Sequence, residues 1–302
     1  MTWELLDTWI VATAAMVAVA CVLPGCFLYL SRQSMMSHGI AHAVLPGIVI
    51  GHLCTGQVET PALFIGAIVA GVICALLTRF LQNHSGVEEG AALGISFTFL
   101  FAVGLAMQRL LADNVHIEPS HVLMGNLETA VFNILFTDDL APEAFWRATV
   151  ASVINLLFIV IFFKELTFST FDPNHADTVE ARPRLMYYGL MTISALTCVV
   201  AFEAVGSILV VAMMILPPAI ASFFTKRLKP LIVLSLAFAL LSTLIGHLLS
   251  ISLFGDIAQL LFRLPRSTST NTAGGITLVL CAFLGLGILW KSISTRLQNH
   301  TS

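Results

Sequence analysis

Nine continuous apolar runs constrain this chain of 302 residues more than any other feature. Most are about 20 residues long, the length of an α-helix that crosses the hydrocarbon core of a membrane. Strands of a membrane β-barrel would instead alternate apolar and polar residues over segments of about ten. The runs therefore predict an all-α fold, a polytopic membrane helical bundle. They cover, approximately, residues 5–30, 38–54, 61–81, 91–111, 145–163, 185–202, 205–224, 230–253 and 274–290.

The composition agrees with a chain that lies mostly in the membrane. Hydrophobic residues make up 58% and charged residues 10%, with a mean hydropathy of +0.94, whereas soluble domains carry about 25% charged residues. The stretch 185–224 is too long for one crossing, so we expect it to turn between Glu203 and Gly206. Nine spans follow, or eight if one segment is re-entrant. Pro217 and Pro218 interrupt the seventh run near one end, as in spans that line a cavity, although some spans simply end in this way.

The basic residues orient the bundle. With the N-terminus outside, ten of the 14 Lys and Arg residues fall on the cytoplasmic side, in accordance with the positive-inside rule. Eleven of the 17 acidic residues then lie outside, where they would attract cations; the alternative is that they only reflect the topology. The N-terminal residues MTWELLDTW lack the positive charge of a signal peptide, so we expect the first span to be retained. The six cysteines contain no CxxC pair and are interpreted as packing residues.

Two histidines, His38 and His42, lie four residues apart in the second apolar run. On a helix they would share one face, with Cβ atoms about 5–6 Å apart, close enough for both imidazoles to bind one Zn²⁺ or Mn²⁺. His52 would fall within about 40° of His38 around a straight helix, although Pro46 lies between them and can kink it. These three histidines are the candidate metal contacts. The alternative is that they are hydrogen-bonded packing residues.

The outer connection, residues 112–144, combines His116, Glu118 and His121 with an apolar middle. This mixture predicts a segment that packs on the bundle as a re-entrant or interfacial helix. For His116 and His121 a structural role is favoured over metal capture.

The inner connection, residues 164–184, reads KELTFSTFDPNHADTVEARPR. Asp172 before Pro173 predicts the start of a helix, because the carboxylate caps free N–H groups and proline suits the first helical position. Pro183 then ends it. An isolated helix this short is marginal, so we expect it to dock on a partner. The chain contains no GxxxxGK[ST] phosphate loop, no HExxH motif and no Ser-His-Asp arrangement, so no catalytic residue is predicted.

Three segments together resemble the permease subunits of bacterial ATP-binding-cassette importers for manganese, zinc and iron, the ABC-3 metal permeases. They are SHGIAHAVLPGIVIG, TFSTFDPNHA and VGSILVVAMMILPPAIAS. The similarity covers nearly the whole chain, in the expected order and spacing. In that family the FDP segment forms a coupling helix that docks on a separate ATPase. The resemblance implies this role for a helix around residues 168–183, and for its residues Phe171, Asp172, Pro173 and Ala176.

The family's second-span motif usually reads like GDAISHAVLPG, in which the aspartate four residues before the histidine contacts the metal in the channel. His42 matches the histidine, and His38 occupies the place of the aspartate. The change from aspartate to histidine removes a negative charge and a hard oxygen ligand. Ligand chemistry then favours the softer Zn²⁺ or Fe²⁺ over Mn²⁺.

The resemblance implies an ABC importer permease architecture, with one transmembrane permease domain over residues 1–302 in the bacterial cytoplasmic membrane. Such a subunit carries a divalent metal ion as substrate and holds no permanent cofactor. The expected partners are cytoplasmic ATP-binding subunits, an extracytoplasmic metal-binding protein and a second permease, identical or paralogous, with no nucleic acid. One alternative is a gradient-driven metal transporter or channel without an ATPase, for which Glu203 is the candidate coupling acid. The other is a permease for iron chelates or cobalamin, against which the histidine pair favours a bare ion.

Overall fold

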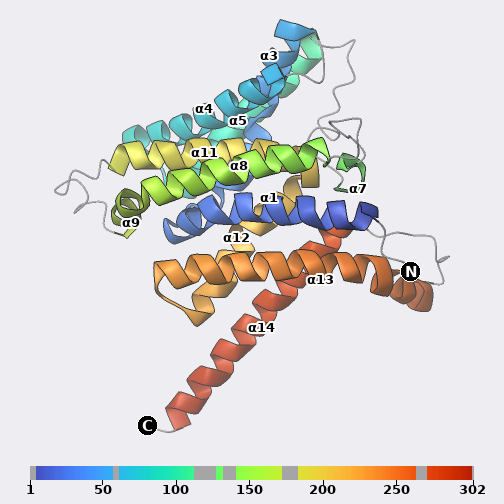
Figure 1. The fold of residues 1–302 in the computed structure, drawn as a ribbon. Helices are drawn as coiled ribbons and strands as arrows, with labels where there is room; N and C mark the ends of the chain where they lie inside the picture. Colours follow the sequence, from blue (N-terminus) through green and yellow to red (C-terminus); the bar gives the residue numbers. More distant parts are fainter. Residues whose placement is uncertain are drawn as a thin grey trace.

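The computed structural model describes residues 5–56, 61–111, 127–131, 141–171, 183–262 and 271–300. Within these ranges the elements of regular structure are all α-helices (Figure 1). They are α1 (Leu5–Leu30), α2 (Met36–Ala43), α3 (Leu45–Thr55), α4 (Pro61–Ser85), α5 (Glu89–Leu111), α7 (Leu127–Ala130), α8 (Glu143–Ile161), α9 (Phe163–Phe171), α11 (Pro183–Val205), α12 (Ser207–Phe224), α13 (Leu228–Phe262) and α14 (Thr272–His300).

Nine stretches in the described part of the chain are long and apolar enough to cross a membrane, with α2 and α3 counted together as the single stretch Met36–Thr55. Successive crossings pass back and forth through the bundle, so that α7 and α9 lie at opposite ends of it (Figure 1). The prediction of an all-α bundle with nine spans is confirmed. Helices α13 and α14 extend beyond the predicted runs 230–253 and 274–290, because hydropathy marks only the part of a helix that lies in the hydrocarbon.

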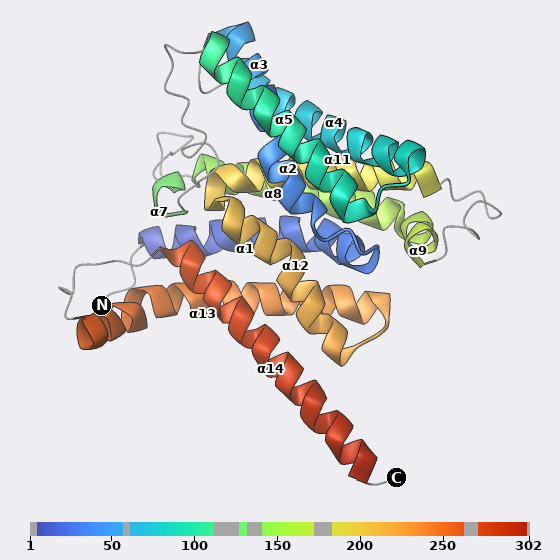
Figure 2. The same ribbon diagram turned by 180° about the vertical axis from the view of Figure 1, so that it is seen from behind.

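Helix α1 occupies the centre of the bundle and packs against α8, α11, α12 and α13 (Figures 1 and 2). Its inward side chains Cys21, Cys26 and Phe27 are completely buried. All six cysteines are free thiols; four are buried, as expected of packing residues, whereas Cys54 and Cys281 are exposed. Helix α14 crosses this core, and its C-terminal half extends away from the other helices (Figure 2).

Glycines allow two pairs of helices to approach closely. A Cβ atom added to Gly47 of α3 would overlap the carbonyl oxygen of Gly66 in α4, and one added to Gly66 would overlap the carbonyl of Gly47. Gly25 of α1 faces the carbonyl of Met214 in α12 in the same way. Small residues at such crossings let two backbones make van der Waals contact, which is a main source of helix association in membranes.

The long stretch that was expected to turn does so at a glycine. Helix α11 ends at Val205, Gly206 has φ 81° and α12 begins at the next residue; a positive φ of this kind favours glycine. The predicted turn between Glu203 and Gly206 is therefore confirmed.

The predicted interruption at Pro217 and Pro218 is wrong, because α12 continues through both prolines to Phe224. Each proline removes one helical hydrogen-bond donor, which leaves the carbonyls of Met213 and Met214 without their usual helical partners. The close contact with Gly25 covers the Met214 carbonyl. The helix therefore continues past the two prolines where it packs closely against α1.

Candidate functional site

The short helix α2 presents His38 and His42 on one face. Their ring centroids are 4.9 Å apart, with the ring planes at 82° to each other. His38 is exposed and His42 is partly buried in this single chain. The four-residue spacing thus gives two neighbouring imidazoles, one turn apart, of which at least one is open to an ion outside the subunit.

Two phenylalanines of α5 form a wall beside this pair. The ring of Phe97 lies 6.2 Å from the ring of His38 and 5.9 Å from that of His42, and the ring of Phe101 lies 5.7 Å from His42. Gly39 brings the two helices together, because a Cβ atom there would lie 2.6 Å from Cδ1 of Leu93. The two phenylalanine rings therefore pack on the α5 side of the histidine pair and restrict the rotamers of both imidazoles.

The helix is broken immediately after the pair. Val44 separates α2 from α3, and Pro46 occupies the first turn of α3. Proline has no N–H, so the backbone carbonyl of His42 lacks the donor that would lie four residues further along an unbroken helix. The interruption expected at Pro46 is therefore present as a break between α2 and α3, and the His42 carbonyl lacks this helical donor.

His52, the third candidate, is not brought to the pair. It lies in α3 with 6% of its side chain exposed, ten residues beyond His42 and thus about 15 Å along the two helices. The described residues contain no group of three or more His, Cys, Asp or Glu side chains that could hold a metal ion. Within the described residues, one chain therefore supplies two neighbouring histidines.

Of the candidate coupling residues, the structure describes Phe171, at the end of α9, and α9 lies at the end of the bundle opposite α7 (Figure 1). Helix α9 follows α8 after a break at Phe162, packs against α11, α8 and α1, and ends at Phe171, whose side chain is exposed. Asp172, Pro173 and Ala176 lie outside the described residues. The outer-connection residues His116, Glu118 and His121 also lie outside them.

Glu203 makes an ion pair that the sequence does not reveal. Its two carboxylate oxygens accept hydrogen bonds from Nη1 of Arg147 in α8, at 2.6 and 2.7 Å. The same guanidinium donates to Glu143 and lies over the ring of Phe64 in α4, 4.7 Å from the centroid. Glu203 thus joins α11 to α8 and α4 at one end of the bundle.

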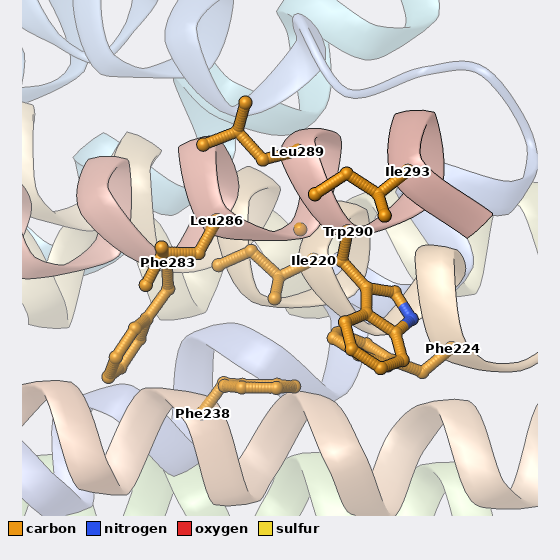
Figure 3. A pocket seen from close by; sticks show the side chains of 9 residues that line it. Ile220, Phe224, Phe238, Phe283, Leu286, Leu289, Trp290 and Ile293 are labelled. Atoms are coloured by element: carbon orange, nitrogen blue, oxygen red, sulfur yellow. The ribbon is translucent and has the colours of Figure 1, made fainter. Parts of the chain in front are cut away.

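An apolar pocket lies elsewhere, between α12, α13 and α14 (Figure 3). Its lining consists of Ile220, Phe224, Phe238, Phe283, Leu286, Gly287, Leu289, Trp290 and Ile293. The indole nitrogen of Trp290 is the one polar side-chain atom in this lining (Figure 3). The pocket offers no ligand for a cation, so the histidine pair on α2 remains the candidate ion-contact site.

Comparison with known proteins agrees with this fold. The model of the ABC 3 transport family matches residues 3–259. The manganese transport system membrane protein MntD of Bacillus subtilis is 37% identical over 260 residues, which cover 84% of this chain and 88% of MntD. The zinc transport system membrane protein TroD of Treponema pallidum is 37% identical over 250 residues, 82% of this chain and 68% of TroD.

A solved structure shares the architecture as well. PsaBC from Streptococcus pneumoniae, in complex with Fab, matches with a TM-score of 0.69 and 27% sequence identity over 94% of this chain and 91% of that chain. The fold and these similarities define a multi-pass permease subunit of the bacterial cytoplasmic membrane. The chain belongs to the ABC 3 transport family, as its three signature segments predict.

Proposed function

We propose that this chain is the membrane subunit of an ATP-driven importer and that it passes a divalent metal ion across the cytoplasmic membrane. The observation that carries the proposal is the His38–His42 pair, with ring centroids 4.9 Å apart on the open face of α2. Relatives whose names record transport of manganese and zinc support the same class of substrate.

The geometry of the pair suits an ion in transit better than a resident ion. Two imidazoles bind a borderline cation such as Zn²⁺, whose structural sites in proteins usually have four protein ligands. A second copy of the subunit, facing the first across a twofold axis, would supply two more imidazoles to the same ion. The carbonyl of His42, which lacks its helical donor because of Pro46, would add an oxygen ligand, as unwound backbone does in other transporters. Such a site binds the ion tightly enough to replace its hydration shell, and it releases the ion when the two copies move apart.

Ligand type favours Zn²⁺ or Fe²⁺ over Mn²⁺ at this site. His38 stands where the family's usual motif has an aspartate, so an imidazole nitrogen replaces a charged oxygen. Nitrogen ligands suit the later first-row metals, whereas carboxylates suit Mn²⁺. The proposed selectivity therefore rests on one residue.

The proposed partners follow from the two ends of the bundle. With the N-terminus outside, α9 and Phe171 lie on the cytoplasmic side, where an ATPase would dock on the segment that continues through Asp172, Pro173 and Ala176. An extracytoplasmic metal-binding protein would deliver the ion to the opposite end, near α7. In this proposal all 302 residues form one permease domain, with a coupling helix around residues 168–183.

The ion pairs of Glu203 argue against the gradient-driven alternative. A proton-coupling acid must gain and lose a proton during the cycle, whereas both oxygens of this carboxylate accept hydrogen bonds from Arg147. A guanidinium at 2.6 Å stabilises the charged form of this carboxylate. The imidazoles of His38 and His42 on α2 can bind a metal ion directly, which favours a free cation over an iron chelate or cobalamin as the substrate.

Uptake into membrane vesicles tests the proposal. Right-side-out vesicles are required, because an importer moves the ion from the outer face of the membrane to the inner face. The vesicles should be loaded with ATP and the purified ATPase. Radioactive zinc or manganese is then added outside, together with the binding protein. We expect uptake only with ATP and the ATPase present. Uptake of equal rate that is driven by a pH gradient, without either of them, would contradict the proposal and support a secondary transporter.

A further inference from the structure

The apolar pocket between α12, α13 and α14 is a groove with an exposed rim. It encloses about 490 Å³, within the range of pockets that hold small molecules. Its wall contains three neighbouring aromatic rings, since the ring of Phe238 lies 5.8 Å from that of Phe224 and 5.7 Å from that of Phe283. On the rim, Leu286 and Trp290 of α14 are 62% and 63% exposed, and Trp290 points from α14 toward Phe224 (Figure 3). The groove is therefore accessible from the membrane around the bundle.

Basic residues lie at one end of this groove. Nζ of Lys291 in α14 lies 5.5 Å from the ring centroid of Phe223, in the last turn of α12. Lys226 and Arg227 follow three and four residues after Phe223, in the turn between α12 and α13, and both are exposed. With the N-terminus outside, this end of the three helices is the cytoplasmic one. Three cations thus lie where the groove meets the cytoplasmic surface of the membrane.

The part of the sequence that forms the groove is strongly biased towards positive charge. Residues 204–302 contain seven Lys and Arg residues and a single acid, Asp256. Asp256 comes 28 positions after Leu228, the first residue of α13, which is about 42 Å further along that helix. The one acid of these three helices therefore lies far from the cytoplasmic end. Their charge at this end is complementary to an anionic ligand.

We propose that the groove binds an anionic phospholipid of the cytoplasmic leaflet. One acyl chain lies against the aromatic rings of the groove, and the phosphate lies beside Lys226, Arg227 and Lys291. Basic pockets between helices on this side of a membrane bind anionic headgroups, and a tryptophan such as Trp290 is typical of the headgroup level. This lipid site is separate from the histidine pair on α2 and from the passage of the metal ion.

The lining favours a flexible chain over a helix of a second subunit. Helix contacts in membranes use small residues that let two backbones approach, whereas the exposed rim carries the large side chains Leu286, Leu289 and Trp290. The glycine of the lining, Gly287, already packs inside the subunit, because a Cβ atom there would lie 2.8 Å from Cδ2 of Phe223. A twofold contact at this end would also bring the same cations of two copies together, and like charges repel.

Quenching of Trp290 fluorescence by brominated lipids tests the site on the full chain. Phenylalanine replaces Trp3, Trp9 and Trp146, so that Trp290 is the one remaining indole of the four. The protein is placed in phosphatidylcholine bilayers that contain the same fraction of either phosphatidylglycerol or phosphatidylcholine with brominated acyl chains. We expect brominated phosphatidylglycerol to quench more strongly. Its affinity relative to phosphatidylcholine should fall about fivefold in Lys291→Gln, since one cation near an anionic headgroup contributes about 1 kcal/mol.

Matched variants separate a defined site from a general attraction of anionic lipid. Leu286→Phe adds a ring at the rim of the groove and should weaken the preference for phosphatidylglycerol. Leu278→Phe, at an exposed position of α14 outside the lining, should leave the preference unchanged. Arg79→Gln in α4, on the same side of the membrane, should also leave it unchanged.

If the single-tryptophan chain fails to fold, native mass spectrometry of the unaltered chain and of Lys291→Gln gives the same comparison, as the number of phosphatidylglycerol molecules retained. Equal quenching by the two brominated lipids, or a preference that persists unchanged in Lys291→Gln or in Leu286→Phe, would overturn the proposal. Weak quenching by both lipids would overturn it as well, and would assign the groove to a contact with a second subunit.

Discussion

The side-chain amide of Asn155 in α8 donates a hydrogen bond to the carbonyl oxygen of Ala20 in α1, at 2.8 Å. In an uninterrupted helix this carbonyl would accept from the N–H four residues further on, but that residue is Pro24, which has no N–H. The same amide donates to Oγ1 of Thr197 in α11, at 2.7 Å. One buried side chain therefore joins three helices and satisfies a carbonyl that a proline leaves open.

Replacing Asn155 with Leu should destabilise the bundle by about 1–2 kcal/mol, the range found for interhelical hydrogen bonds in membrane model peptides. Pro24→Ala restores the missing donor to Ala20, so the double variant should lose less stability than the sum of the single variants. Thermal unfolding in detergent measures all three. Leu157→Ala, on the exposed side of the same helix, is the matched control. Strict additivity would show that the amide and the proline do not share the Ala20 carbonyl.

Gly47→Ala should push α3 away from α4 and lower the stability of the bundle. Gly47 lies in the first turn of α3, just after the break that follows the histidine pair. The added methyl group meets backbone atoms of Gly66, which cannot rotate away, and overpacking of this kind costs about 1–3 kcal/mol. Gly94→Ala in α5 is the control, because a Cβ atom there has no neighbour within 4 Å. The two melting temperatures in detergent decide the matter, and equal values would contradict the close approach of α3 and α4.

The spans and the break in the second one were predictable because each leaves a local mark. Long apolar runs mark the helices, and Pro46 marks the end of α2. The neighbours of the histidines were not predictable. Spans in a membrane are apolar on all sides, so no amphipathic pattern shows which face of α5 meets α2. Phe97 and Phe101 are four residues apart, a spacing that fits one helix face but does not identify its partner.

The same limit applies to charged residues. Arg147 and Glu203 lie 56 positions apart and come together only because α8 packs against α11. Conversely, the prediction that Pro217 and Pro218 interrupt the helix was wrong. The sequence contains no sign of the close contact between Gly25 of α1 and the Met214 carbonyl of α12.

The double variant Asp172→Lys, Pro173→Gly should uncouple the ATPase while leaving the subunit in the membrane. Loss of the helix cap alone costs about 1 kcal/mol, about a fivefold change in the population of an ordered docking helix. The reversed charge adds to this. Metal-stimulated ATP hydrolysis by the reconstituted complex is the measurement. Asp139→Lys, a charge reversal in the outer connection, is the control, and a double variant with unchanged hydrolysis would exclude this segment as the docking site.

The orientation of the bundle predicts which reagents reach which connection. In a chain without its six native cysteines, a cysteine introduced at Asn174 should react only with a maleimide supplied from the cytoplasmic side. One introduced at Asp138 should react only from outside. Labelling of intact cells and of inverted vesicles distinguishes the two cases. Reaction of the Asn174 variant in intact cells would show that the orientation is the opposite one. The coupling segment would then lie outside the cell, where no ATPase can dock.

Metal uptake by variants of the α2 histidines is the most direct test of the proposed ion path. We predict that His42→Ala abolishes ATP-dependent zinc uptake and that His38→Ala lowers it by about tenfold or more, the effect of losing a ligand worth 1.4 kcal/mol. His38→Asp should retain uptake and shift the preference towards Mn²⁺, because it restores a hard oxygen ligand. His84→Ala, at the end of α4, serves as the control for an exposed histidine outside the path. Zinc uptake by His42→Ala at the native rate, with native expression and assembly, would show that the pair only packs against Phe97 and Phe101 and does not touch the ion.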